Sequence, residues 1–288
     1  MLLELQAVVW HRDLASPTSE SRTGVVAALS ARISALNEEQ EMAALHKQIM
    51  MEYADVFGPV PSVENLPDHE HCRVKLKDPS LTLDARSYPS PRKYQEAWTK
   101  LIGEHIAAGR IVPLASQHSS PAFLVPKADP SADLRLVVDY RKLNANVVPD
   151  SYPLPSIPDI FSDCSKGKYW CKFDMTNLFF QTRIHPDDRH LFAMNMPVGA
   201  FEWVVMPMGF RNAPSIHQRR MTTALRKHIR KICHVFIDNC IGWSDSLKAH
   251  GLVVRKILDA CRANGLFLNP KKSIIITTSV TFLGHRID

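Results

Sequence analysis

The sequence predicts an α+β fold in which helices pack on one face of an antiparallel sheet. Hydrophobic residues make up 45% of the 288 positions, which is enough for a sizeable core and excludes a disordered chain. Runs rich in β-branched and aromatic residues at 169–174, 201–205 and 233–237 are typical of strands. Apolar residues recur at helical spacing within 214–232 and 247–261.

The first part of the chain predicts a separate helical leader. Residues 1–57 have helix-forming composition, with a break at 16–23. Residues 58–67 contain three prolines and neither a helical nor a strand period, so we expect a linker there. The predicted organisation is a leader of unknown role at 1–60 and a main domain at 61–288.

The next elements are a helix and two strands. Ser90 and Pro91 have the residue types of an N-cap and first helical position, and Gly109 is typical of a C-cap. Between them Tyr94 and Trp98 begin an apolar stripe that continues to 106. Strands are expected at 123–126 and 134–138, around a turn at 128–131.

The second half predicts two hairpin strands between two helices. A strand at 169–174 ends on Asp174, and a strand at 233–237 leads through a turn at Asp238 and Asn239 into a strand at 241–243. The helix at 214–232 carries one basic face, for which a solvated surface is the commoner explanation. Gly265 ends the last helix.

The net charge and the cysteine content narrow the possible classes of protein only slightly. The net charge of +6 agrees with a nucleic-acid partner without demanding one. Six scattered cysteines without a C-x-x-C pair predict buried thiols and a reducing compartment. His69, His71 and Cys72 lie close together, but without a second ligand pair they favour a strand edge over a zinc site.

The sequence contains no recognisable signal for secretion or for membrane insertion. The sequence shows neither a signal peptide nor a run of 18 apolar residues, so we expect no membrane association and no secretion. The expected location is the cytoplasm or the nucleus. The oligomeric state is left open.

Asp174 and Asp238 are the residues most suggestive of chemistry. Each lies where a predicted strand gives way to a turn. Carboxylates at neighbouring strand ends can share Mg²⁺, which prefers oxygen ligands, and two such ions can clamp the oxygens of a phosphoryl transfer. From spacing alone, turn-forming aspartates remain the commoner explanation.

A resemblance covers about three quarters of the chain. From residue 68 onward it is similar to the reverse transcriptase of gypsy-type long-terminal-repeat retrotransposons. The matching segments follow the order of that family and lie at residues 68–74, 109–112, 119–121, 125–127, 135–144, 152–155, 172–174, 206–214, 235–240, 268–272 and 282–285.

The resemblance implies a fingers-and-palm polymerase fold and an RNA-directed DNA polymerase activity. Asp174 and Asp238 then hold Mg²⁺, with Mn²⁺ as a possible substitute. Asn239 occupies the place of a further catalytic aspartate. Lys272 becomes the candidate general acid for the departing pyrophosphate, with Lys271 as its rival.

The resemblance also implies binding residues and partners. The expected partners are an RNA or DNA template with its primer, and deoxynucleoside triphosphates. Phe179 would exclude a 2′-hydroxyl from the bound sugar. The residues expected to bind the nucleotide are Lys127, Arg135, Phe179, Gln181, Met208 and Gly209. The residues expected to grip the primer are Phe282, Leu283, Gly284 and His285.

The sequence departs from the family at two places. Leu178 replaces a glycine and narrows the nucleotide space. Asn239 keeps an oxygen but loses a charge, which we expect to cost on the order of 3–5 kcal/mol, or roughly 10²- to 10⁴-fold in rate. We expect no thumb, ribonuclease H or integrase within 61–288, and therefore weak, salt-sensitive template binding. The alternatives are a catalytically dead nucleic-acid-binding relic and a structural interaction protein.

Overall fold

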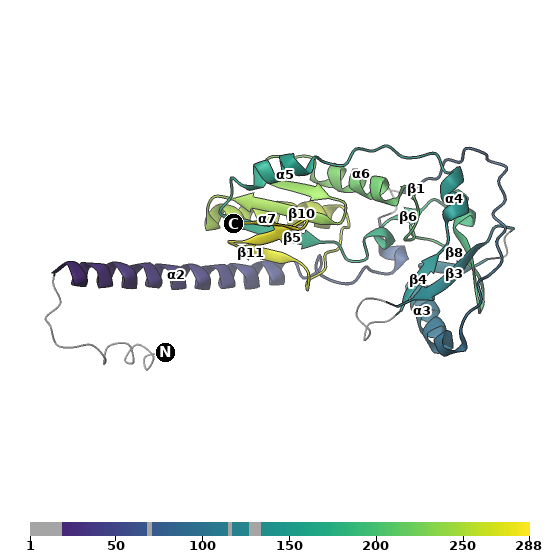
Figure 1. The fold of residues 1–288 in the computed structure, drawn as a ribbon, viewed down its shortest axis with the longest axis horizontal. Helices are drawn as coiled ribbons and strands as arrows, with labels where there is room; N and C mark the ends of the chain where they lie inside the picture. Colours follow the sequence, from purple (N-terminus) through teal and green to yellow (C-terminus); the bar gives the residue numbers. More distant parts are fainter. Residues whose placement is uncertain (1–18, 68–70, 115–116, 127–133) are drawn as a thin grey trace. The chain divides into compact units, whose positions relative to one another are not determined.

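The computed structural model describes residues 19–67, 71–114, 117–126 and 134–288 (Figure 1). The chain divides into two compact units, Met1–Gln48 and Ile49–Asp288. The described part of the first unit is helical, within α2 (Ser19–Glu52). Several of its apolar side chains are exposed, namely Val25, Val26, Leu29, Ile33 and Leu36.

The centre of the second unit is a four-stranded antiparallel sheet, which we call the palm sheet. Its strand order is β11-β5-β10-β9. The strands are β5 (Tyr169–Asp174), β9 (Cys233–Phe236), β10 (Asn239–Ser244) and β11 (Ile274–Thr277). The register pairs Asn239 with Asp174 and with Phe236, so the end of β5 meets the β9–β10 turn.

Helices α6 (Ala213–Leu225) and α7 (Leu247–Ala263) pack on one face of the palm sheet. Alternate side chains of a strand point to opposite faces, so only every second residue of β10 can meet these helices. Cys240 and Gly242 face α7, and Ile257 of α7 comes so close to Gly242 that a Cβ there would lie 2.8 Å from its Cδ1. The helix-covered face expected from the sequence is therefore present.

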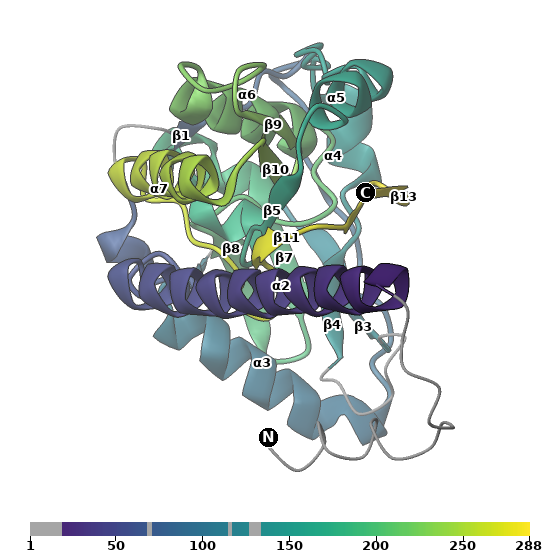
Figure 2. The same cartoon turned by 90° about the vertical axis from the view of Figure 1, so that its left-hand side faces the viewer.

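The opposite face of the sheet has a cover of its own. Ile241 and Trp243 point to this side and pack with Ile160 of α5 (Ile157–Cys164). The hairpin of β12 (Val280–Phe282) and β13 (His285–Ile287) completes the cluster through Phe282. Figure 2 shows α7 and α5 on opposite sides of the palm strands.

A five-stranded sheet, which we call the fingers sheet, has the order β2-β8-β7-β3-β4. Its strands are β2 (Ile111–Pro113), β3 (Ser120–Val125), β4 (Arg135–Val138), β7 (Ala193–Met196) and β8 (Gly199–Trp203). Strands β3 and β7 run parallel, and the other pairs are antiparallel. Helix α3 (Gln95–Ala107) packs against β2.

Short elements connect these layers. Their bounds are η1 (Val63–Asn65), β1 (His71–Cys72), η2 (Arg92–Tyr94), α4 (Arg141–Asn146), η3 (Leu178–Gln181), β6 (Arg183–Ile184) and η4 (Pro186–Phe192). Strands β1 and β6 pair in parallel, which buries Cys72. Residue 69 lies outside the described residues, and no metal-binding group of three or more His, Cys, Asp or Glu side chains exists within them.

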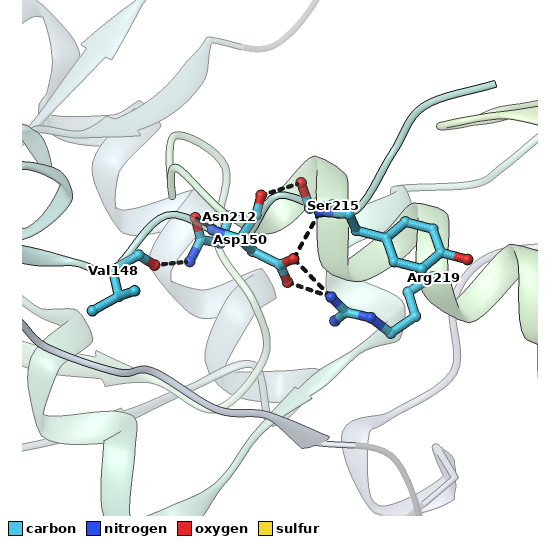
Figure 3. Close-up of polar contacts among 6 residues, drawn as sticks. Val148, Asp150, Asn212, Ser215 and Arg219 are labelled. Carbon is cyan, nitrogen blue, oxygen red and sulfur yellow. Dashed lines mark hydrogen bonds and ion pairs between the residues drawn. The ribbon is translucent and has the colours of Figure 1, made fainter. Parts of the chain in front are cut away.

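A polar network ties the segment between the two sheets to α6 (Figure 3). The Asn212 amide donates to the carbonyl of Val148 and accepts from the backbone N–H of Asp150. The Ser215 hydroxyl donates to the carbonyl of Asp150, and both carboxylate oxygens of Asp150 accept from Arg219 at 2.7 Å. Asn212 is buried, and this network gives the segment a defined path from α4 to α5.

Some sequence-based boundaries prove wrong. The helix expected at 214–232 ends at Leu225, because the chain turns through residues 226–232 with Arg230 at a φ of +65°. Residues 58–67 are not a free linker, since Val60, Val63 and Leu66 are buried in the core. Ser90 does not cap α3, because that helix begins only at Gln95, after η2. The Ser90 hydroxyl instead accepts from the Trp98 indole.

Other expectations are confirmed. Strand β5 has the predicted bounds, and Gly109 and Gly265 follow their helices at positive φ. All six cysteines are free and buried. Among the described helices, none combines the length and the apolar character needed to cross a bilayer.

Gly242 provides a test of the packing between α7 and the palm sheet. In Gly242→Ala the new methyl group meets Cys171 Sγ at 2.7 Å and Ile257 Cδ1 at 2.8 Å. We expect the free energy of unfolding to fall by about 1–3 kcal/mol, the usual cost of overpacking. Chemical denaturation measures the change.

Gly103→Ala is the matched control. A Cβ at Gly103 meets no atom within 4 Å and the residue lies inside α3, so alanine there raises stability by roughly 0.5–1 kcal/mol. Equal stability changes in the two variants would contradict the close approach at Gly242.

Candidate active site

The β9–β10 hairpin has a strained tip. Its two loop residues are Ile237 and Asp238, one position earlier than the expected turn at Asp238 and Asn239. Ile237 has a φ of +53°, a conformation that a β-branched residue adopts at a cost. Positive φ at the first loop residue is typical of a type II′ turn.

Gln218 of α6 supports this tip from below. Its Oε1 accepts from the backbone N–H of Ile237 at 2.7 Å, and its Nε2 donates to the carbonyl of Val235 at 3.2 Å. The Gln218 side chain is fully buried. Sequence reasoning missed this residue, although a glutamine in the apolar stripe that includes Met221 and Leu225 was a usable signal.

Backbone pairing brings Asp174 and Asp238 to the same place. The N–H of Met175 donates to the carbonyl of Asp238 at 3.0 Å, directly beyond the Asn239–Asp174 pair. On the other side, the N–H of Asn269 donates to the carbonyl of Asp174 at 2.8 Å. The two predicted metal ligands therefore lie on adjoining strand ends, as the sequence predicted.

Burial disfavours the ionised form of the Asp174 carboxyl. Burial raises the pKa of the Asp174 carboxyl, and the negative charge of Asp238 raises it further. Lys272 opposes this rise, with its Nζ at 3.7 Å from Asp174 Oδ1. A pair of partly desolvated carboxylates with one ammonium group fits the ligand chemistry of a hard divalent cation.

Asn239 contacts Asp238 directly. Its Nδ2 donates to Asp238 Oδ1 at 2.8 Å. The amide thus acts as a hydrogen-bond donor that orients a neighbouring carboxylate. An aspartate at this position has no such donor, so the substitution changes both the charge of the site and the contacts of Asp238.

A cavity of about 550 Å³ opens above the carboxylates. Its lining joins the palm to the fingers sheet and includes the predicted residues Asp174, Asp238, Lys272, Arg135, Phe179 and Met208. Leu178 also lines the cavity, in agreement with its expected effect on the space there. A volume of this size falls in the range of ligand-binding sites.

Two of the predicted nucleotide-binding residues do not line this cavity. Gln181 is buried, and its amide contacts backbone groups of Thr176 and Phe267. Gly209 has a φ of +86° and lines a separate cavity of about 640 Å³ with Tyr88 and Phe123. A third, Lys127, lies outside the described residues.

The expected primer-gripping residues form a hairpin. Phe282 pairs with His285 across the loop residues Leu283 and Gly284, both at positive φ. Phe282 is fully buried in the palm core, whereas Gly284 and His285 are exposed. The hairpin is therefore open to solvent at Gly284 and His285.

Three aromatic side chains, His105, Phe180 and Trp203, form part of the cavity wall. His105 packs edge-on against Phe180 and Trp203, with ring centroids at 5.6 Å and 5.0 Å. Burial, with a smaller effect of Arg110, lowers the pKa of His105 to about 4. The imidazole is therefore neutral at physiological pH, and it acts in this wall as an aromatic ring.

Fold and hairpin together define a fingers-and-palm polymerase domain. Residues 125–287 match the family described as reverse transcriptase (RNA-dependent DNA polymerase). The chain therefore belongs to the reverse transcriptase family, as the resemblance predicted.

Curated relatives agree with this assignment. The chain is 32% identical over 276 residues to the retrovirus-related Pol polyprotein from transposon opus of Drosophila melanogaster, which covers 91% of the chain and 27% of that polyprotein. It is 31% identical over 204 residues to the Pol polyprotein from transposon gypsy of the same organism, across 69% of the chain and 20% of that protein. The expected gypsy-type affiliation is confirmed.

A viral relative and a solved structure extend the comparison. The chain is 34% identical over 221 residues to the enzymatic polyprotein of cauliflower mosaic virus (strain Strasbourg), covering 75% of the chain and 32% of that protein. A foamy viral protease-reverse transcriptase in complex with an RNA/DNA hybrid has a similar fold, with a TM-score of 0.72 at 20% identity over 85% of this chain and 33% of that one. The chain thus spans about a third or less of the lengths of these proteins.

His105 predicts an acid sensitivity of the cavity wall. Its ordinary pKa is 6.5, and its folded-state pKa is about 4. Between these values the unfolded chain binds a proton that the folded chain does not, so stability falls as the pH drops from 6.5 toward 4. This loss is on the order of 3 kcal/mol.

His105→Phe keeps an aromatic ring in the same position and removes the titration. We expect the difference in unfolding free energy between the two proteins to grow in favour of phenylalanine as the pH falls from 6.5 toward 4, measured by urea denaturation across the pH range. His217 and His250 titrate in both proteins and cancel in this comparison. A difference that does not vary with pH would contradict a neutral buried His105.

Proposed function

We propose that this chain is an RNA-directed DNA polymerase domain that transfers deoxynucleotides to a primer 3′ end. The observation that carries the proposal is the juxtaposition of Asp174 and Asp238 beneath the 550 Å³ cavity. In this reaction the primer 3′-hydroxyl oxygen attacks the α-phosphorus, and pyrophosphate departs. Membership of the reverse transcriptase family supports this chemistry, and the adjoining positions of the Asp174 and Asp238 carboxylates support the site.

Asp174 and Asp238 are the residues that would hold Mg²⁺, or Mn²⁺ in its place. Bound there, the ions would neutralise charge on the reacting phosphate and lower the pKa of the attacking hydroxyl. The raised pKa of Asp174 and the proximity of Lys272 are the observations that fit a cation at this point. Asn239 orients Asp238 and contributes no charge.

The remaining roles follow from the cavity. Arg135 lines it with a guanidinium group that suits a triphosphate. Lys272 lines it too, and we propose its ammonium group as the donor of a proton to the leaving pyrophosphate. Lys271 does not line the cavity, which favours Lys272 of the two lysines. RNA or DNA template with its primer and deoxynucleoside triphosphates are the proposed substrates.

Asn239→Asp tests the proposed function. Restoring the carboxylate strengthens the charge that faces the metal, and we expect magnesium-dependent primer extension to rise at least roughly tenfold, or about 1.4 kcal/mol of barrier. Primer extension on an RNA template measures the rate, and calorimetric titration with Mn²⁺ measures the metal site independently of activity.

Asp238→Ala in the Asn239→Asp background is the control. We expect it to abolish extension and weaken Mn²⁺ binding, since the hairpin then loses a ligand. A folded Asn239→Asp protein that binds Mn²⁺ and primer–template yet extends nothing would favour the alternative of a catalytically dead nucleic-acid-binding relic.

Phe179→Val tests the selection of the sugar. Phe179 lines the cavity beside Leu178, where its ring limits the space next to the carboxylates. The smaller side chain opens room for a 2′-hydroxyl, so we expect a larger share of ribonucleotide incorporation, measured by competition between the two nucleotide types in primer extension. Unchanged discrimination in an active protein would leave Phe179 as a packing residue only.

A further inference from the structure

Outside the cavity, the palm carries a cluster of positively charged side chains. We call it the basic turn, and it consists of Arg226, Lys227, Arg230, Lys231 and, from the adjacent helix α7, Lys256. All five residues are exposed. The segment from Arg219 to Lys231 contains no acidic residue at all.

The turn and α7 both come close to Gly242 of β10. A Cβ built on Gly242 would lie 2.8 Å from Ile257 Cδ1 and 3.3 Å from the carbonyl oxygen of Ile232. Lys256 directly precedes Ile257, and Lys231 directly precedes Ile232. The two lysines therefore lie on segments that both approach Gly242. His228 lies among them, and burial together with Lys256, Lys227 and Lys231 lowers its pKa.

Little negative charge compensates these cations. Arg230 has one carboxylate nearby, with Asp159 Oδ2 at 3.7 Å from its guanidinium. Within the described residues, no carboxylate lies at ion-pair distance from Arg226, Lys227, Lys231 or Lys256. Other cations of α7 differ, since Arg255 pairs with Glu52 and Arg262 with Asp55.

The turn is also held in a fixed and strained shape. Arg230 has a φ of +65°, which is unusual for a residue with a long side chain. Its N–H donates to the carbonyl of Cys233, and the N–H groups of Lys231 and Ile232 both donate to the carbonyl of His228. The C-terminal end of α6 accounts for cations at 226 and 227, but it does not account for Lys256 in the middle of α7.

We propose that the basic turn binds the sugar–phosphate backbone of a nucleic acid outside the polymerase cavity. The turn precedes β9, whose four residues separate it from the Ile237–Asp238 tip by roughly 13 Å. The site is therefore distinct from the catalytic carboxylates.

The chemistry favours an extended polyanion. None of the five cations lines either of the two cavities described above. Several exposed cations on two segments suit a chain with regularly repeated phosphates, and such contacts carry no sequence preference. An acidic protein segment would satisfy the same charges, and it is the alternative that the experiment must separate.

The test compares Lys227→Gln/Lys256→Gln with Arg32→Gln/Lys47→Gln in the full chain. Both double variants remove the same charge, and the control residues are exposed on α2. Fluorescence anisotropy measures the binding of a single-stranded oligothymidylate of about 16 nucleotides over a salt series. Thermal melting confirms that each variant is folded.

We expect the basic-turn variant to bind more weakly and to lower the slope of log K against log salt by about 1.4, which is roughly 0.7 for each phosphate that a removed lysine neutralised on a single strand. The control variant keeps the parental slope. Equal slopes in the parent and the basic-turn variant would overturn the proposal.

A competition arm identifies the partner class. A poly-glutamate peptide of equal charge should displace the oligonucleotide poorly, and displacement at equal charge concentration would assign the surface to an acidic protein segment instead. Because the readout is binding, it does not depend on polymerase activity. If the protein showed no primer extension but the basic-turn variant still had the lower salt slope, the proposed function would be contradicted and the proposed binding surface would be supported.

Discussion

The pairing of β5 with β10 is the constraint on which the site depends. The register that places Asn239 opposite Asp174 also places Asp238 beside the end of β5. A slip of one residue would turn each side chain of β10 to the other face, because strand side chains alternate. Packing resists such a slip on both faces, through Gly242 against α7 and through Trp243 in the cluster with α5. The geometry of the proposed site is therefore a product of core packing.

Asn239 affects the charge of the site more than its shape. The hairpin has its turn, its support from Gln218 and its pairing with β5, so the absence of one carboxylate has not changed the architecture. What changes is the negative charge available to a cation, together with a new donor to Asp238. Asn239, the first residue of β10, can carry this change because its backbone alone makes the pairing with Asp174 and Phe236.

Motif residues were predictable because their chemistry is local. Asp174, Asp238 and the bounds of β5 follow from strand pattern and family resemblance, and Phe179 and Arg135 lie at the cavity as expected. The early end of α6 was missed because the apolar spacing continues to residue 232, although the chain turns there through local bonds such as that from the Arg230 N–H to the carbonyl of Cys233. The position of Gln218 in the apolar stripe was a signal, but its bonds to Val235 and Ile237 became visible only in the structure. Gln181 illustrates the same limit: its position near the site was expected, but its bonds to Thr176 and Phe267 follow from the tertiary fold.

The burial of every cysteine makes the thiols natural reporters of opening. Cys164, Cys171, Cys233 and Cys240 have no exposed surface, and Cys261 has 1%. All five belong to the palm, whereas Cys72 lies in the core shared with the fingers sheet. A thiol reagent can reach them only through local or global unfolding, so labelling rates resolved by residue measure how independently the two halves of the domain open.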